Sequence, residues 1–433
     1  MRVTKCLRGV RVAGAILIML FLASCCTSCS PAVGQPSASS SVTPATTGRQ
    51  LWASTLPNSG GPVEAASRDG TRVFVSGEAR IGFKTAAYSA ATGAQLWVRT
   101  YRPAIYSNPT AIAVSPDGTR VYVTGNTAKG GATVAYDART GKQLWARQSV
   151  LTAYYATDLA VSPDGTTVYV AGEGRAKRPF AVIAYAAATG KQQWLRSATK
   201  FGAVSVGVSA DGKTVYVTGS GGGLLTIAYT ATGTVKWATR YKNPYPGHHG
   251  VGTQVVPGPG GNVVYVVGSA GNKRGHQDIV TLAYRAASGK QMWARRYEAD
   301  LGASLPRLAV TPDGQTVIVT GALTNGFRGY AALISYRAST GETQWTARVP
   351  GGVASAGLFI DAGAGLVIVP HGNTVIIGGS RISAYSVAHG TVLWTARYPL
   401  YPTAFSGDGT RLFETGWNGR SANGGSITVA YRA

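Results

Sequence analysis

The sequence predicts an all-β protein in which residues 47–433 form a single β-propeller of eight four-stranded blades. Three observations predict this fold. A tryptophan recurs about every 49 residues, turns of the Pro-Asp-Gly type stand between tryptophans, and an unpaired strand at the N-terminus matches a strand missing at the C-terminus. A repeat of this length cannot bury a core alone, so neighbouring repeats must pack on one another.

Eight of the nine tryptophans follow the repeat, and each has a glycine four residues before it, as Gly141 precedes Trp145. The repeat tryptophans are Trp52, Trp97, Trp145, Trp194, Trp237, Trp293, Trp345 and Trp394. Trp417 lies outside the pattern. Because a residue that recurs in nearly every repeat has the same packing role in each, we interpret these eight tryptophans as structural residues.

The segments between tryptophans have the pattern of strands. After the turn Ser115–Gly118, Val121 and Val123 alternate with other residues at a period of two, which is typical of β-structure. Pro-Asp-Gly favours a tight turn, because Pro fixes φ, Asp bonds its own backbone and Gly accepts a positive φ. The second repeat therefore predicts four strands, near residues 111–114, 120–124, 133–136 and 143–147.

Closure of the ring sets the number of blades. Seven complete repeats end at Trp97 through Trp394, and an eighth begins near Thr403 and stops after its third strand, at 426–433. The segment 47–52 supplies the missing fourth strand. Pairing it with the C-terminal strand would complete the last blade and remove exposed sheet edges. Eight blades are therefore predicted, with seven as the main rival.

The N-terminal region predicts export. Residues 1–24 hold four basic residues and no acid, followed by an apolar run of twelve residues, which is too short to span a bilayer and is typical of a signal peptide. The run ends in Leu22-Ala23-Ser24-Cys25, which resembles the lipobox of bacterial lipoproteins. That resemblance implies lipidation at Cys25 and an extracytoplasmic protein anchored to the cell membrane. Ordinary secretion is the alternative.

The segment 25–46 is predicted to be a flexible tether, because it is rich in Ser, Thr, Pro and Ala and has no acidic residue. The four cysteines all lie within the first 29 residues. The propeller therefore has no disulfide framework and no cysteine nucleophile.

The stretch Ala135–Trp145, Ala-Tyr-Asp-Ala-Arg-Thr-Gly-Lys-Gln-Leu-Trp, resembles the tryptophan-docking repeat of the quinoprotein propellers, also called pyrroloquinoline-quinone-like. The turn and the following Val-Tyr-Val-Thr-Gly are similar to YVTN-type repeats. The resemblance covers about residues 47–433 and implies eight blades with a tryptophan packed between neighbours. It implies an activity less strongly, since such propellers include dehydrogenases, lactonases, assembly lipoproteins and binding modules.

No catalytic set emerges from the sequence. No residue matches the catalytic positions of the quinone-dependent dehydrogenases, so no cofactor is expected, and pyrroloquinoline quinone with calcium is the alternative. Three acidic pairs have the residue types of general acid–base sites, and we interpret them as surface or capping groups. These pairs are Glu64 with Glu78, Asp158 with Glu173, and Glu298 with Asp300.

One histidine-rich constellation is a weak metal-site hypothesis. His248 and His249 are predicted in the loop entering the fifth repeat, and His276 and Asp278 in the loop between that repeat's second and third strands. Both kinds of loop open on the same end of a propeller, and imidazole and carboxylate groups are common metal ligands. Ordinary polar loop residues are the alternative interpretation.

The chain is strongly basic, with 41 Lys and Arg, 17 Asp and Glu, and a formal net charge of +24. Exported proteins meet little nucleic acid, so no nucleic-acid partner is expected. Basic and tyrosine residues recur in the loops between repeats, which predicts one variable, basic, tyrosine-rich face and one uniform face. The candidate ligand-binding residues of the variable face are Arg102, Tyr106, Tyr154, Tyr155, Arg175, Lys177, Arg178, Tyr241, Lys242, Lys273, Arg274 and Arg328.

The sequence therefore favours a non-catalytic, monomeric cell-surface lipoprotein that binds a protein or an anionic or carbohydrate-like envelope ligand through this face. A quinone-dependent dehydrogenase or a lactonase-like enzyme is the alternative function. A generally basic surface without a specific partner is the alternative interpretation of the charge.

Overall fold

The computed structural model describes residues 48–433 apart from short gaps. The gaps are 106, 150–153, 175–179, 199–201, 246, 248, 299–301, 325–328, 350–365, 379–381, 397–400, 407 and 419–424. The predicted signal peptide, Cys25 and the tether lie outside the described residues. All described elements are strands. Within the described ranges, no helix is long and apolar enough to cross a membrane.

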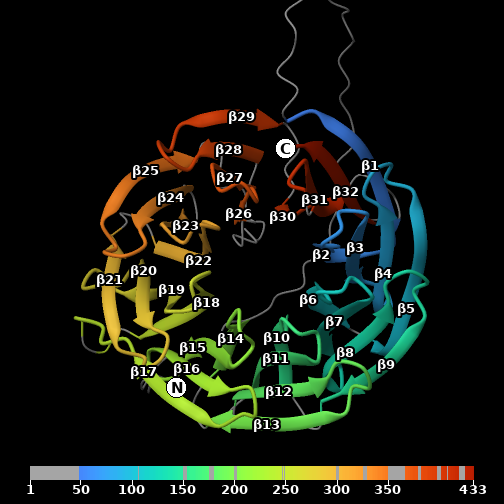
Figure 1. The fold of residues 1–433 in the computed structure, drawn as a ribbon, viewed down its shortest axis with the longest axis horizontal. Helices are drawn as coiled ribbons and strands as arrows, with labels where there is room; N and C mark the ends of the chain where they lie inside the picture. Colours follow the sequence, from blue (N-terminus) through green and yellow to red (C-terminus); the bar gives the residue numbers. More distant parts are fainter. Residues whose placement is uncertain are drawn as a thin grey trace, which may run out of the picture. The chain divides into compact units, whose positions relative to one another are not determined.

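The strands form eight four-stranded antiparallel sheets arranged as the blades of a ring (Figure 1). Blades 1 to 4 contain β2 (Gly60–Ala66), β3 (Arg72–Glu78), β4 (Ile81–Ser89) and β5 (Gln95–Ile105); β6 (Asn108–Val114), β7 (Arg120–Thr127), β8 (Gly130–Asp137) and β9 (Gln143–Gln148); β10 (Tyr154–Val161), β11 (Thr167–Gly174), β12 (Phe180–Ala186) and β13 (Gln192–Ala198); and β14 (Gly202–Val208), β15 (Thr214–Ser220), β16 (Leu224–Thr230) and β17 (Val235–Arg240).

Blades 5 to 8 follow in the same order around the ring. They contain β18 (Gly250–Pro257), β19 (Val263–Gly271), β20 (Gln277–Arg285) and β21 (Gln291–Tyr297); β22 (Gly302–Val310), β23 (Thr316–Thr324), β24 (Gly329–Arg337) and β25 (Thr343–Val349); β26 (Leu366–Ile368), β27 (Thr374–Ile377), β28 (Ile382–Ser386) and β29 (Val392–Ala396); and β30 (Tyr401–Phe405), β31 (Arg411–Asn418), β32 (Gly425–Arg432) and β1 (Gln50–Pro57). The predicted eight blades are confirmed, and a seven-bladed ring is excluded.

The last blade is completed by the N-terminal strand, as predicted. Strand β1 pairs antiparallel with β32, with Trp52 opposite Ala430 and Leu56 opposite Ser426. Outside the ladder, the Gly48 N–H donates to the Arg432 carbonyl at 2.8 Å. The two ends of the chain therefore meet in one sheet, and β1 covers the edge that β32 would otherwise expose.

The repeat tryptophans lock each blade to the next. The Trp145 indole N–H of blade 2 donates to the Ala187 carbonyl of blade 3 at 2.9 Å, and seven of the eight tryptophans make the equivalent bond. Each indole ring also covers the glycine of the next blade's turn; a Cβ on Gly190 would lie 2.6 Å from the Trp145 ring. Trp394 covers Gly48 in this way, so the packing runs across the closure.

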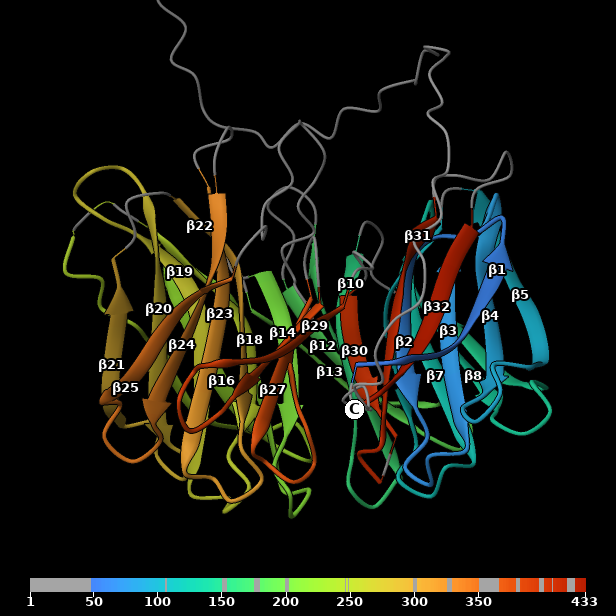
Figure 2. The same ribbon diagram turned by 90° about the horizontal axis from the view of Figure 1, so that it is seen from above.

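The two ends of the ring differ (Figure 2). Short turns between first and second strands and between third and fourth strands gather at one end, the turn face. Connections between blades, and hairpins between second and third strands, lie at the other end, the loop face. In the turns, Asp117 accepts from the Ser115 hydroxyl and the Thr119 backbone, and these hydrogen bonds hold its pKa below the ordinary value. The matching Asp408 has a pKa lowered to about 2.

Candidate functional site

The described part of the loop face has one site where predicted ligand residues come together, at the junction of blades 4 and 5. The connection that follows β17 and the hairpin between β19 and β20 are joined there, since the Asn243 amide donates to the Gly271 carbonyl at 2.9 Å. We call this place the basic-tyrosine site. Its residues are Arg240, Tyr241, Lys242, Tyr245, His249, Lys273 and Arg274.

The foundation of the basic-tyrosine site is a buried ion pair. Arg296 of β21 bonds the carboxylate of Asp278 at 2.7 Å, and Asp278 is fully buried. The same guanidinium donates to the Gly271 carbonyl at 2.7 Å and lies 5.0 Å from the centre of the Tyr245 ring. The amide of Asn272 donates to the second oxygen of Asp278 at 2.7 Å. Because these bonds satisfy Asp278 and tie Arg296 to both loops, they hold the site in one arrangement.

A small pocket opens above this network, with a volume of about 180 Å³. Tyr241, Tyr245, Asn243 and His249 line it together with backbone of glycines on both sides. Small-molecule sites occupy roughly 300–1,000 Å³, so this pocket is suited to one side chain or one small chemical group of a larger ligand.

Exposed basic side chains stand at the end of β17, in the connection that follows it and in the hairpin between β19 and β20. Arg240, Lys242, Lys273 and Arg274 are all exposed. The buried carboxylate of Asp278, at the start of β20, is neutralised by Arg296. The site therefore presents several cations and aromatic rings to a ligand, which is chemistry suited to an anionic group.

The structure places the other predicted ligand residues elsewhere. Arg102 lies within β5 of blade 1, a blade on the opposite side of the ring, and Tyr155 lies on β10 of blade 3. The strand position of Tyr154 is described, but its side chain is not. The remaining candidates, which are Tyr106, Arg175, Lys177, Arg178 and Arg328, lie outside the described residues.

The metal-site hypothesis is not supported by the described residues. Asp278 was expected in a loop, but it lies in β20 and is fully buried, where Arg296 and Asn272 take both its oxygens. His249 and His276 are described, whereas His248 is not. In the described ranges, no group of three or more His, Cys, Asp or Glu is placed to hold a metal ion. Asp278 is a structural residue of the basic-tyrosine site.

The basic residues are less concentrated on the loop face than the sequence predicted. Arg147 and Arg295 lie on outer strands and donate to carbonyls of the next blade, Arg147 to Gly190 at 2.9 Å and Arg295 to Gly341 at 2.7 Å. The turn face also carries exposed Lys and Arg, including Lys142, interspersed with the turn aspartates. The turn face is uniform in its short turns, as predicted, but it carries basic residues as well, so charge distinguishes the two faces less than the sequence indicated.

A carboxylic acid missed by sequence reasoning lies in the core. Glu414 of β31 is fully buried, and neither of its carboxyl oxygens has a hydrogen-bond partner in the described structure. The other seven blades have an aliphatic side chain at this place in their second strand: Val75, Val123, Val170, Val217, Val266, Val319 and Ile377. Burial, and then the charge of Glu64, raise the pKa of Glu414 well above its ordinary value.

Replacing Glu414 with the aliphatic residue of the repeat is expected to stabilise the propeller. Glu414→Val removes an unpartnered polar group from the core, worth about 2 kcal/mol, or a rise in Tm of about 2–3 °C for a domain of this size. The unfolded chain loses this proton near pH 4.5 while the fold retains it. Stability is therefore expected to fall by up to about 1.4 kcal/mol per pH unit as pH rises from 4.5 to the folded pKa.

Thermal melts of the parent, Glu414→Val and Glu414→Gln chains between pH 4 and 8 test this expectation. Both variants should lose the component of the pH dependence that comes from Glu414, and the Val variant should melt highest. A Val variant that melts below the parent at pH 7 would show that Glu414 has a stabilising partner.

Comparison with known proteins places this architecture in a family. The family model described as outer membrane protein assembly factor BamB matches residues 40–178, 178–277 and 276–425. The chain belongs to this family. The resemblance to quinoprotein-like propellers seen in the sequence is thus confirmed, while no curated protein sequence matches the chain.

Solved structures show the same fold at low identity. BamB from Moraxella catarrhalis is 16% identical, with a TM-score of 0.57 over 89% of this chain and 99% of that chain. Quinohemoprotein alcohol dehydrogenase from Comamonas testosteroni is 16% identical, with a TM-score of 0.63 over 88% and 76%. Kuenenia stuttgartiensis hydrazine synthase is 17% identical, with a TM-score of 0.55 over 75% and 95%. At these identities the likeness shows the fold and leaves the activity open.

Proposed function

We propose that this family member is a non-catalytic, extracytoplasmic scaffold that binds an acidic segment of a partner protein through the basic-tyrosine site. The observation that carries this proposal is the presence of exposed cations and a tyrosine-lined pocket on the same two loops, which the Arg296–Asp278 pair holds. The family description, an assembly factor for outer membrane proteins, supports a protein as the partner.

The chemistry of the site suits an extended acidic ligand. Lys242, Lys273 and Arg274 are exposed and free to meet carboxylates, and Tyr241 and Tyr245 add flat contact area. The pocket accommodates one side chain at a time, which fits a polypeptide that inserts a single anchor residue. Because Arg296 is held by Asp278, Gly271 and Asn243, the site is ordered before the ligand arrives, which lowers the entropic cost of binding.

Reversing three charges at the site is expected to abolish most of the binding. The triple variant Lys242→Glu, Lys273→Glu and Arg274→Glu should weaken the affinity for poly-L-glutamate at least about tenfold at low salt, since three contacts become repulsive. The matched control reverses three exposed lysines of the turn face, Lys142, Lys191 and Lys213. Fluorescence anisotropy of labelled poly-L-glutamate measures both affinities.

Equal losses in the two triple variants would show that poly-L-glutamate reports overall charge, and the site would be rejected. Polyphosphate distinguishes the ligand class in the same assay. Tighter binding of polyphosphate than of poly-L-glutamate at the basic-tyrosine site would identify an anionic envelope polymer instead of an acidic protein segment.

We further propose that the protein is held at a membrane by a lipid on Cys25. The sequence Leu22-Ala23-Ser24-Cys25 supports this, and the family description supports an extracytoplasmic location. Replacing Cys25 with Ser is expected to move the protein from the membrane fraction to the soluble fraction and to abolish labelling by radioactive palmitate. Retention of the label would reject lipidation at Cys25.

A quinone-dependent dehydrogenase is the second candidate, favoured by the likeness to the quinohemoprotein alcohol dehydrogenase. Calcium beside that cofactor takes six to eight oxygen ligands, and among the residues that the structure describes no group of three or more His, Cys, Asp or Glu is placed to hold a metal ion. Asp158 on the innermost strand of blade 3 accepts from the Ser205 hydroxyl at 2.9 Å and the Val206 N–H at 3.0 Å, and so ties blade 3 to blade 4. Burial raises its pKa, although these bonds oppose the rise. We therefore propose that the protein works without a quinone.

A further inference from the structure

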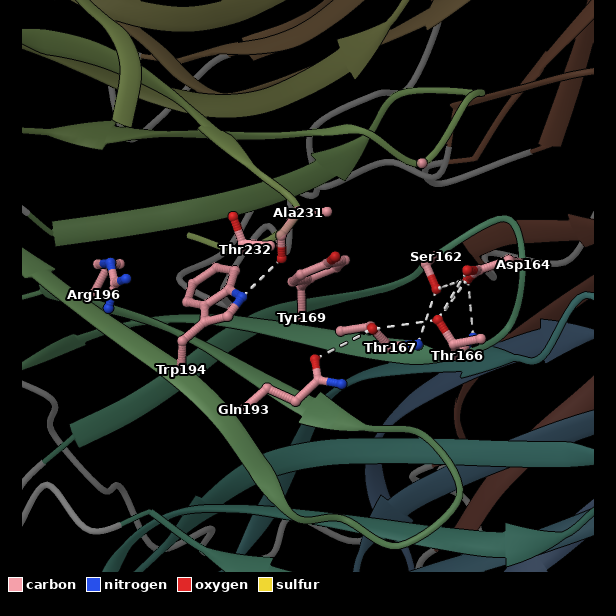
Figure 3. Close-up of a pocket in the computed structure, with 11 residues that line it drawn as sticks. Ser162, Asp164, Thr166, Thr167, Tyr169, Gln193, Trp194, Arg196, Ala231 and Thr232 are labelled. Atoms are coloured by element: carbon pink, nitrogen blue, oxygen red, sulfur yellow. Dashed lines mark hydrogen bonds between the residues drawn. The ribbon is translucent and has the colours of Figure 1, made fainter. Parts of the chain in front are cut away.

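A second pocket lies on the turn face between blades 3 and 4, far from the chemistry discussed above. Its volume is about 630 Å³, which is within the range of small-molecule sites. Figure 3 shows its lining, with Arg196 at one end and Asp164 and Thr166 at the other. Trp194, Gln193 and Thr232 lie between them in this view.

The pocket lies beside a turn of blade 4 that is shorter than its counterparts. In six blades the turn between third and fourth strands closes with a bond from the glycine N–H to a carbonyl four residues earlier, as Gly141 bonds Asp137 at 2.9 Å. Blade 4 lacks one residue here, and Gly233 bonds Thr230, three residues earlier, at 2.8 Å. The shorter turn leaves less chain over the groove beside Trp194.

The short turn also leaves part of Arg196 without its usual partner. Arg147 and Arg295 each donate twice to the next blade, through Nε to the turn glycine and through Nη2 to the threonine before it, at 2.7–2.9 Å. Arg196 keeps the Nε bond to Gly233, at 2.6 Å, and Nη1 bonds Leu195. No partner for its Nη2 occurs among the described residues. The exposed guanidinium, 5.8 Å from the centre of the Trp194 ring, therefore has a free donor edge.

The other end of the pocket is built to accept hydrogen bonds. The carboxylate of Asp164 is exposed and is held in place by Ser162 and by the backbone and hydroxyl of Thr166. The pKa of Asp164 is held below its ordinary value by these bonds, so it remains an anion at neutral pH. The Thr167 hydroxyl donates to Oε1 of the exposed Gln193 side chain at 3.3 Å. This bond leaves the N–H groups of the Gln193 amide for a ligand.

We propose that this pocket binds a carboxylate-bearing sugar, a hexuronate unit, with the carboxylate on the free edge of Arg196 and the hydroxyls toward Gln193, Thr166 and Asp164. One cation together with a set of hydroxyl-binding groups matches the chemical groups of a sugar acid, which carries one anionic group and several hydroxyls on a rigid ring. A planar guanidinium edge is suited to a carboxylate. This site is independent of the basic-tyrosine site and of the function proposed for it.

Titration of the isotope-labelled protein with glucuronate, followed by NMR chemical shifts, tests the proposal. Glucuronate is expected to shift signals of Trp194 and Thr232 with a Kd in the millimolar range, and glucose is expected to bind at least about tenfold more weakly, since it lacks the carboxylate. Arg196→Ala should abolish the preference for glucuronate. Arg147→Ala, which removes the same docking role at a junction with a regular turn, should leave glucuronate binding unchanged.

A second variant keeps the test decisive if Arg196→Ala unfolds. Inserting one alanine between Ala231 and Thr232 restores the regular turn length, so it should abolish glucuronate binding while maintaining or raising Tm. Glucose binding as tightly as glucuronate, equal losses from Arg147→Ala and Arg196→Ala, or unchanged binding in the insertion variant would each overturn the proposal. Acetate binding as tightly as glucuronate would also overturn it, since the sugar ring would then contribute nothing.

Discussion

A circular permutant that carries residues 46–57 after Ala433 is expected to melt like the parent, whereas a chain that simply lacks residues 46–57 is expected to lose cooperative unfolding. Strand β1 is the outer strand of blade 8, and its removal exposes the edge of β32 and uncovers the core around Phe413. The Gly48 bond to Arg432 places the two chain ends where the other blades have a continuous turn. Joining them in sequence therefore recreates the repeat without new geometry.

Deletion of residues 27–45 is the control, because it removes most of the predicted tether, 25–46, and no described strand. Circular dichroism melts compare all four chains. If the chain lacking residues 46–57 melted cooperatively at the parent temperature, the closure of the ring by β1 would not stabilise the fold. If the permutant failed to fold, the order of strands in blade 8 would need another explanation.

Trp145→Ala is expected to cost about 3–5 kcal/mol, or about 5 °C in Tm for a domain of this size. The Trp145 side chain is 5% exposed and packs between Tyr122 of its own blade and Tyr185 of the next, with ring centres 5.8 and 6.2 Å away. Truncation leaves a cavity at the junction of blades 2 and 3 and removes the indole bond to Ala187. Differential scanning calorimetry measures the loss.

Leu144→Ala is the matched control for Trp145, since Leu144 is the preceding residue on the same strand and is 40% exposed. We expect it to change Tm by less than about 1 °C, because surface truncations away from special features usually have small effects. Similar losses for the two variants would contradict a specific role of the repeat tryptophans in joining blades.

The sequence was sufficient for the architecture because each local signal agrees with the global fold. The spacing of Trp97 through Trp394, the turn chemistry around residues such as Asp117, and the unmatched segment before Trp52 all predict the same closed ring. The periodic pattern can be recognised in the sequence because every blade must make the same packing contacts with its neighbours.

The sites were harder to predict from the sequence, because they depend on the positions and contacts of individual side chains. Asp278 was expected among loop ligands, and only the register of β20 shows that it is buried on Arg296. Alignment of the second strands would have revealed Glu414 as the single acid among aliphatic residues. The short turn near Thr232 can be found in the sequence by its missing residue. Its effect on the hydrogen bonds of Arg196 cannot, because that effect depends on which carbonyl of the next blade lies beside the guanidinium.

The most direct test of the central claim, a binding scaffold without redox chemistry, is a titration of the purified mature chain with pyrroloquinoline quinone and calcium. Absorbance reports binding, and dye-linked oxidation of simple alcohols and sugars reports turnover. The account predicts no saturable binding and no turnover. Saturable binding with turnover would contradict it and would make this propeller an enzyme.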